Sequence, residues 1–161
     1  PFKLYCLTDD PAGILPEVVI RKCPAVDIPS PMCRGGWRKT ALWAPRVADL
    51  SGECLFLDLD IIITGPLDGF FDYRGASDYM VMRNYTTMRR RIGNTSVFRF
   101  TVGSHPYVLE RLLAEPLKMR SLYGNSQTFI SDTIGGMDFW PDGWIRQFKV
   151  HCLHPFQGDQ A

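Results

Sequence analysis

The sequence lacks an excess of charge of either sign. Its 161 residues include 18 Lys and Arg and 17 Asp and Glu, so the formal net charge is +1 with histidine neutral. Proteins that wrap nucleic acid usually show a clear basic excess, and we expect no nucleic-acid partner. Long apolar runs are also missing, because acidic residues interrupt the longest, 55–57 followed by 61–63. Neither run approaches the roughly 20 apolar residues of a transmembrane helix.

Paired cysteine motifs are missing as well. The chain has five cysteines, an odd number, and none of them form a CxxC pair. Cys6 and Cys54 lie in apolar, strand-like runs, where a reduced thiol packs as a small hydrophobic side chain. A disulfide framework or a zinc site is therefore not favoured. No signal peptide is visible, and the sequence predicts a reducing, cytoplasmic location.

The chain does have enough apolar material for one folded domain. Apolar residues make up 45% of it and charged residues 22%, which is typical of a globular protein. Apolar and β-branched runs predict strands over 2–7, 18–20, 54–57, 79–82 and 96–100. The alternation of these strands with loops and helices along the sequence predicts an α/β protein with a mostly parallel sheet and helices on its faces. Ligand sites of such sheets lie at the carboxyl ends of strands.

Helices are predicted from apolar spacing and start signals. The segment 37–50 has helical spacing, although Pro45 should shorten or kink it. A helical turn is predicted over 67–71, and longer helices over 106–114 and 127–134. Two serines stand where N-caps are expected: Ser104 before the first of these longer helices and Ser126 before the second.

The strongest chemical feature is the acid pair Asp58 and Asp60, which follows the apolar strand 54–57. Side chains at i and i+2 point to the same side of an extended segment. Two carboxylates so close repel each other, and a divalent cation relieves that repulsion while a bound diphosphate completes its coordination. Two solvated acids at a strand end would give the same pattern, so both interpretations stay open on the residues alone.

The run from Leu55 to Phe71 resembles the DxD segment of nucleotide-sugar-dependent GT-A glycosyltransferases. It reads LFLDLDIIITGPLDGFF, an apolar strand followed by the acid pair, more aliphatics and a turn that ends in two phenylalanines. The closest resemblance is to the retaining group that contains glycogenin and bacterial galactosyltransferases. It implies a Rossmann-like GT-A domain, and Mn²⁺ or Mg²⁺ that bridges Asp58 and Asp60 to the diphosphate of a sugar donor, with a UDP-sugar favoured.

Other segments resemble the same family in the same order. Lys39, in the run WRKTALW, is similar to a basic residue that faces the donor. Asn94 and Thr95 are similar to the start of a strand that contacts the sugar, in which Ser96 replaces a glycine. The resemblance implies donor contacts from these three residues. On the residues alone, a solvated helix lysine is the favoured interpretation of Lys39, and Asn94 can be a turn residue before a strand.

The segment 125–131 resembles a helix start of the family that contacts the sugar. Gln127 matches, and the resemblance implies that it binds the donor, whereas Ser126 stands in place of an aspartate. That aspartate holds the sugar or supports the reacting centre in the family. No catalytic residue is assigned in this chain.

The remaining polar groups have simpler interpretations. Residues 8–10 are favoured as a turn at Pro11, and the basic run 89–91 as a solvated loop. His151 and His154 lack the glycine and lysine of the family's late metal-binding segment and are interpreted as structural or surface groups.

The resemblance extends from about residue 2 to residue 148 and lacks two parts of the family. These are the first strand, whose end binds the nucleotide base, and the C-terminal segment with a metal-binding histidine. We therefore interpret 1–161 as a single, incomplete glycosyltransferase-like domain. The resemblance predicts metal-dependent sugar transfer from a nucleoside-diphosphate sugar to an unknown acceptor, with retention of configuration. The alternatives are a haloacid-dehalogenase-type phosphatase, with Asp58 as nucleophile and Asp60 as acid, and a non-catalytic binding module.

Overall fold

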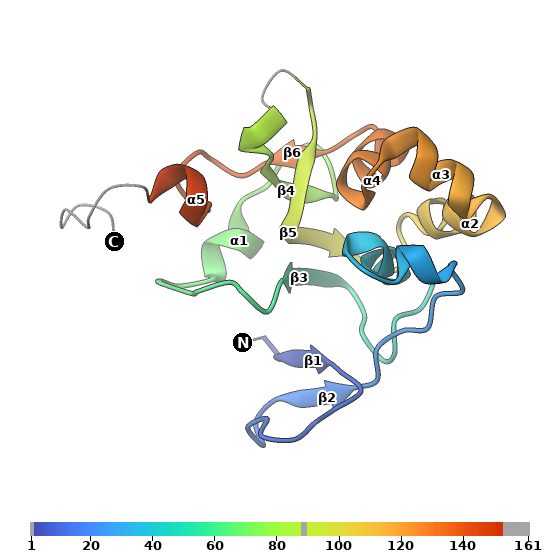
Figure 1. The fold of residues 1–161 in the computed structure, drawn as a ribbon. Coiled ribbons are helices and arrows are strands. Elements are labelled where there is room, and N and C mark those ends of the chain that lie inside the picture. The colour runs from blue at the N-terminus through green and yellow to red at the C-terminus, as the bar shows by residue number, and fades with distance from the viewer. Residues whose placement is uncertain (1, 88–89, 153–161) are drawn as a thin grey trace.

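A computed structural model describes residues 2–87 and 90–152, in which strands form two sheets (Figure 1). The smaller sheet pairs β1 (Tyr5–Leu7) in parallel with β2 (Val19–Arg21). The larger sheet has the order β3-β5-β4-β6. Its strands are β3 (Glu53–Leu57), β4 (Met80–Arg83), β5 (Gly93–Thr101) and β6 (Asp138–Phe139).

The larger sheet is mixed, as the GT-A resemblance predicts, but most of its pairs are antiparallel, so the prediction of mostly parallel pairing is wrong for it. β5 pairs antiparallel with both β3 and β4, and the one parallel pair in this sheet joins β4 to β6. Only residues 84–92 connect β4 to β5. A parallel crossover needs about a dozen residues or more, so the chain turns back and pairs antiparallel. The predicted mixture of helices and strands is confirmed.

Helices follow the predicted order, with additions. The longer α-helices are α2 (Pro106–Ala114), α3 (Pro116–Tyr123) and α4 (Ser126–Ile134), and the short ones are α1 (Asp68–Asp72) and α5 (Phe148–His151). Three segments are 3₁₀ helices: η1 (Ser30–Met32), η2 (Gly36–Trp43) and η3 (Tyr85–Thr87). The helix predicted over 37–50 is η2, which ends at Trp43 because Ala44, before Pro45, is extended. The sequence analysis missed α3, β6 and α5.

Both predicted N-caps are wrong. The cap of α4 is Asn125, whose side chain accepts a hydrogen bond from the Thr128 N–H at 2.9 Å, and Ser126 is the first helical residue. The residue before α2 is His105, which makes no capping hydrogen bond. The hydroxyl of Ser104 instead donates to the carbonyl of Thr101, at 2.8 Å. A serine therefore signals that a helix is near without fixing its first residue.

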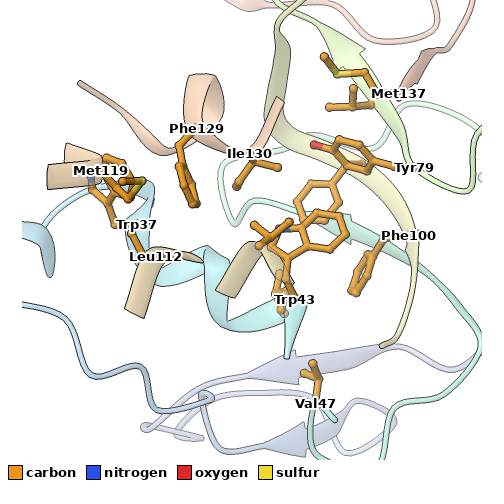
Figure 2. Close-up of a cluster of buried hydrophobic side chains, with 14 of the residues drawn as sticks. Trp37, Trp43, Val47, Tyr79, Phe100, Leu112, Met119, Phe129, Ile130 and Met137 are labelled. Carbon is orange, nitrogen blue, oxygen red and sulfur yellow. The ribbon is translucent and has the colours of Figure 1, made fainter. Parts of the chain in front are cut away.

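Trp43 lies at the centre of the main core and joins η2 to the sheet (Figure 2). Its ring centroid lies 5.1 Å from that of Tyr79, 5.8 Å from that of Phe98 and 5.3 Å from that of Phe100. Trp37, at the other end of η2, packs on Phe129 of α4 with the ring centroids 5.7 Å apart. η2 and α4 thus lie on one face of β5, the face to which Phe98 and Phe100 point, and α2 packs against η2 and α4.

Arg99 of β5 lies on the opposite face, and its side chain is only 2% exposed. It donates hydrogen bonds to the carbonyl oxygens of Phe70, Phe71 and Tyr73, at 2.6, 3.1 and 2.9 Å. A buried charge is tolerated when it is hydrogen-bonded in this way. These bonds hold α1 and the residue after it against the sheet, and so anchor the far end of the loop that begins at Asp58.

Two further findings concern membrane-spanning helices and thiols. No helix among them is long and apolar enough to cross a membrane. All five cysteines are free thiols, of which Cys6 and Cys54 are partly buried. Burial raises the pKa of the Cys54 thiol, so this thiol stays protonated and packs as an apolar group at neutral pH.

We expect Arg99→Met to destabilise the protein by about 2–4 kcal/mol, because it leaves partly buried carbonyl oxygens without their donors. Denaturant unfolding followed by tryptophan fluorescence measures the loss. The matched control is Arg21→Met, which removes a partly exposed ion pair with Asp49 and should change stability far less. Equal losses in the two variants would contradict the anchoring role of Arg99.

Candidate functional site

A pocket of about 310 Å³ lies at the carboxyl end of β3. Four segments far apart in the sequence line it: the start of η2, the end of β3, the first half of β5 and the start of α4. Four of the six predicted site residues are among its lining residues, namely Lys39, Asp58, Thr95 and Gln127. The structure therefore brings most of the predicted site together.

The ladder between β3 and β5 positions Asp58. Its antiparallel register pairs Leu57 with Val97. One further hydrogen bond runs from the Asp58 N–H to the Ser96 carbonyl, at 2.9 Å. This bond fixes Asp58 beside Thr95, which is the next residue along β5 and is buried.

Lys39 forms an ion pair with Asp58 inside the pocket. Its ammonium nitrogen lies 2.6 Å from Oδ1 and 2.7 Å from Oδ2 of Asp58, and 3.1 Å from the carbonyl oxygen of Thr95. It also lies 5.3 Å from the ring centroid of Phe56, a cation–π contact. The Lys39 and Asp58 side chains are 23% and 22% exposed, so solvent and salt screen their attraction less than at the surface.

Gln127 reaches the pocket from the first turn of α4. Its side-chain oxygen accepts a hydrogen bond from the Thr95 N–H at 3.3 Å, which links α4 to β5. Both backbone polar groups of Thr95 are therefore hydrogen-bonded, the N–H to Gln127 and the carbonyl to Lys39. The side-chain amide nitrogen of Gln127 is the polar group that this arrangement leaves for a ligand.

Asn94 and Asp60 do not line the pocket. The Asn94 side chain accepts a hydrogen bond from the Ser96 N–H at 2.9 Å, a local bond within β5. Asp60 is exposed, and the Ile61 N–H donates to the Asp58 carbonyl at 3.2 Å to close a turn. The expectation that Asp58 and Asp60 share one side of an extended segment is therefore wrong, because the chain turns as soon as β3 ends.

The two acids can still be tested as ligands of a divalent cation. Mn²⁺ and Mg²⁺ bind carboxylate oxygens, and Asp58 already turns both of its oxygens toward one cationic centre, the Lys39 ammonium. Within residues 2–87 and 90–152, no three His, Cys, Asp or Glu side chains gather closely enough to hold a metal. Of the two acids only Asp58 lines the pocket, so a cation there would take Asp58 and need a bound diphosphate and water to complete its coordination. Such a cation must compete with Lys39.

The sequence analysis missed part of the pocket wall, formed by Arg34, Gly35, Gly36 and Asn125. Gly35 has a φ of 91° and precedes the first residue of η2. At Gly36 an added Cβ would lie 2.5 Å from the Ser126 hydroxyl oxygen, so η2 and α4 meet here because residue 36 has no side chain. The available signal was a Gly-Gly pair ahead of an apolar helical segment.

Two of the remaining predictions are confirmed. The Thr8 hydroxyl accepts from the Asp10 N–H at 3.1 Å, and the Asp10 side chain accepts from the Ala12 N–H at 3.0 Å, so this segment forms the predicted turn. His151 is structural, since its Nδ1 accepts from the Gln147 N–H at 2.8 Å.

The basic run 89–91 is described only in part. The Arg91 side chain donates to the Met137 carbonyl and lies 3.5 Å from Asp138, although it is exposed, as is Arg90. Arg89 and His154 lie outside the described residues.

The pocket suits an anionic ligand that also carries polar groups. The pocket wall carries two cationic side chains, Lys39 and Arg34, against one carboxylate, Asp58, and Gln127 can hydrogen-bond a hydroxyl group. Comparison of the chain with protein-family models, curated proteins and solved structures finds no match. The chemistry of these side chains is therefore the guide to function.

We expect Gly36→Ala to destabilise the protein by about 1 kcal/mol, because the new methyl group meets the Ser126 hydroxyl in a packed contact. Thermal or denaturant unfolding measures the change. Gly65→Ala is the control, since an added Cβ there meets nothing within 4 Å. A second Ser126→Ala substitution should recover part of the loss, and no recovery would contradict the contact.

Proposed function

We propose that this protein binds a nucleoside-diphosphate sugar in the pocket at the end of β3 and transfers the sugar to an acceptor. One observation carries the proposal: Lys39, Asp58, Thr95 and Gln127, from four separate segments that resemble GT-A glycosyltransferases, close on one pocket. Residues that only stabilise local turns or helix ends are not expected to line the same pocket. The acceptor stays open, and the resemblance favours a UDP-sugar and retention of configuration.

The residues of the pocket suit the charge changes of such a transfer. The bond between the anomeric carbon and the diphosphate oxygen breaks, an acceptor oxygen bonds to that carbon, and the proton of the acceptor hydroxyl passes to the departing diphosphate. Negative charge grows on the departing diphosphate, and Lys39 and Arg34 are the cationic side chains of the pocket that would stabilise it. The Gln127 amide would orient a sugar hydroxyl.

Asp58 and Asp60 are the residues that would hold Mn²⁺ or Mg²⁺. When bound, the cation would supply Lewis-acid stabilisation of the leaving diphosphate. Asp58 contributes from inside the pocket, and Asp60 would approach from the exposed turn that follows β3. The free cysteines support a reducing, cytoplasmic location as part of the same proposal.

A binding module without transfer activity is the second candidate, and Ser126 favours it. This residue stands where the resembled family has an aspartate, and it is 3% exposed and lies against Gly36. A serine cannot supply the negative charge of that aspartate. Within the described residues, no contact favours the phosphatase alternative.

We expect the full chain to bind UDP more tightly with Mn²⁺ than with EDTA, and Asp58→Asn to weaken the Mn²⁺-dependent binding about tenfold or more, the effect of roughly 1.4 kcal/mol. Isothermal titration calorimetry measures the affinity. Asp49→Asn, which changes a carboxylate outside the pocket, is the control.

Incubation with a panel of UDP-sugars then separates the two candidates. A transferase releases UDP and sugar in the presence of Mn²⁺, whereas a binding module retains the intact donor. If UDP binds under neither condition, both candidates are wrong.

A further inference from the structure

The Lys39–Asp58 pair leaves neither partner free for a ligand. An ammonium group has three N–H donors. Three acceptor oxygens surround that of Lys39, the two of Asp58 at 2.6 and 2.7 Å and the Thr95 carbonyl at 3.1 Å. Lys39 must therefore give up at least one of these contacts before it can donate to a phosphate.

Asp58 is constrained in the same way. Both of its carboxylate oxygens face the Lys39 ammonium. A divalent cation that takes either oxygen would have to lie beside a positive charge less than 3 Å from that oxygen, unless Lys39 moves away. Cation binding at Asp58 and movement of Lys39 are therefore one event.

The partial burial of both side chains penalises a half-completed exchange. Each is less than a quarter exposed, and a partly buried charge that loses its oppositely charged partner is destabilised. A cation alone would take Asp58 and leave Lys39 without an anion. An anion alone would take Lys39 and leave Asp58 without a cation. When both ligands bind, both charges stay compensated.

We propose that the Lys39–Asp58 pair couples the two ligands of this pocket, so that a divalent cation and a diphosphate open it together and each raises the affinity of the other. The inference rests on the proposed function, because it takes the anion to be the diphosphate of a nucleotide donor. Linkage requires the coupling factor to be the same in both directions. Lys39 is a donor to the anion in this scheme and a competitor of the cation.

Lys39→Met tests the exchange, because methionine has an unbranched apolar side chain of similar length and removes the charge. We expect Mn²⁺ alone to bind about fivefold more tightly to this variant than to the wild-type chain, since fivefold is the lower end of typical coupling between sites. The electron paramagnetic resonance signal of free Mn²⁺ measures this affinity without any activity assay. The affinities of UDP and of inorganic pyrophosphate should fall, and their dependence on Mn²⁺ should weaken by a similar factor.

Lys118→Met is the matched control. Lys118 also meets both oxygens of a carboxylate, Glu115, at 3.0 and 2.8 Å, but on the exposed surface of α3. It should leave the affinities for Mn²⁺, UDP and pyrophosphate unchanged. Lys39→Arg, which keeps the charge, should not raise Mn²⁺ affinity as Lys39→Met does, and melting curves establish that each variant is folded.

The outcomes separate this inference from the proposed function. Equal Mn²⁺ affinity in Lys39→Met and Lys118→Met would overturn the exchange, and so would the failure of every variant to bind Mn²⁺, even if UDP bound to all of them. If pyrophosphate and Mn²⁺ are coupled through Lys39 but UDP does not bind, the exchange is supported and the nucleotide-sugar function fails.

Discussion

The antiparallel ladder between β3 and β5 is the interaction on which the rest of the structure depends. It extends one hydrogen bond past β3, to Asp58, and that bond places the acid beside Thr95. Because side chains alternate along a strand, β5 also directs Phe98 toward the helices and Arg99 toward α1. β5 thus contributes side chains to the core, anchors the loop that carries the acids and forms one wall of the pocket.

The 3₁₀ form of η2 determines which of its residues reach the pocket. In a 3₁₀ helix, residues three apart lie on the same side. Trp37, Thr40 and Trp43 share one side and are buried, as are Ala41 and Leu42. Gly36 and Lys39 share another side and both line the pocket, where Lys39 meets Asp58. The large aromatic area on the buried side holds η2 against α4 and β5, so the packing of the core fixes where the ammonium of Lys39 lies.

Local features of the sequence predicted most of the helices and strands. The features that they did not predict depend mainly on contacts between segments far apart in the sequence. Apolar spacing gave α2 with its observed bounds, and Pro45 explains why η2 ends at Trp43. The Lys39–Asp58 contact joins residues 19 apart, and nothing in either segment specifies it. The rule that i and i+2 share a side failed at Asp58 and Asp60 because it assumes extended backbone, whereas the chain turns there. The start of α3 at Pro116 had a usable signal, since proline is favoured at the first position of a helix.

A net charge of only +1 gives the whole molecule little long-range attraction for a charged ligand. Selectivity must then come from the pocket, where the Lys39–Asp58 pair already compensates its own charges. Under the proposed exchange, a lone phosphate gains Lys39 at the expense of an unpaired Asp58, and a lone cation gains Asp58 at the expense of an unpaired Lys39. Only a ligand pair that brings both charges avoids that penalty. An internal ion pair thereby discriminates against the separate ions, which two independent charged side chains could not do.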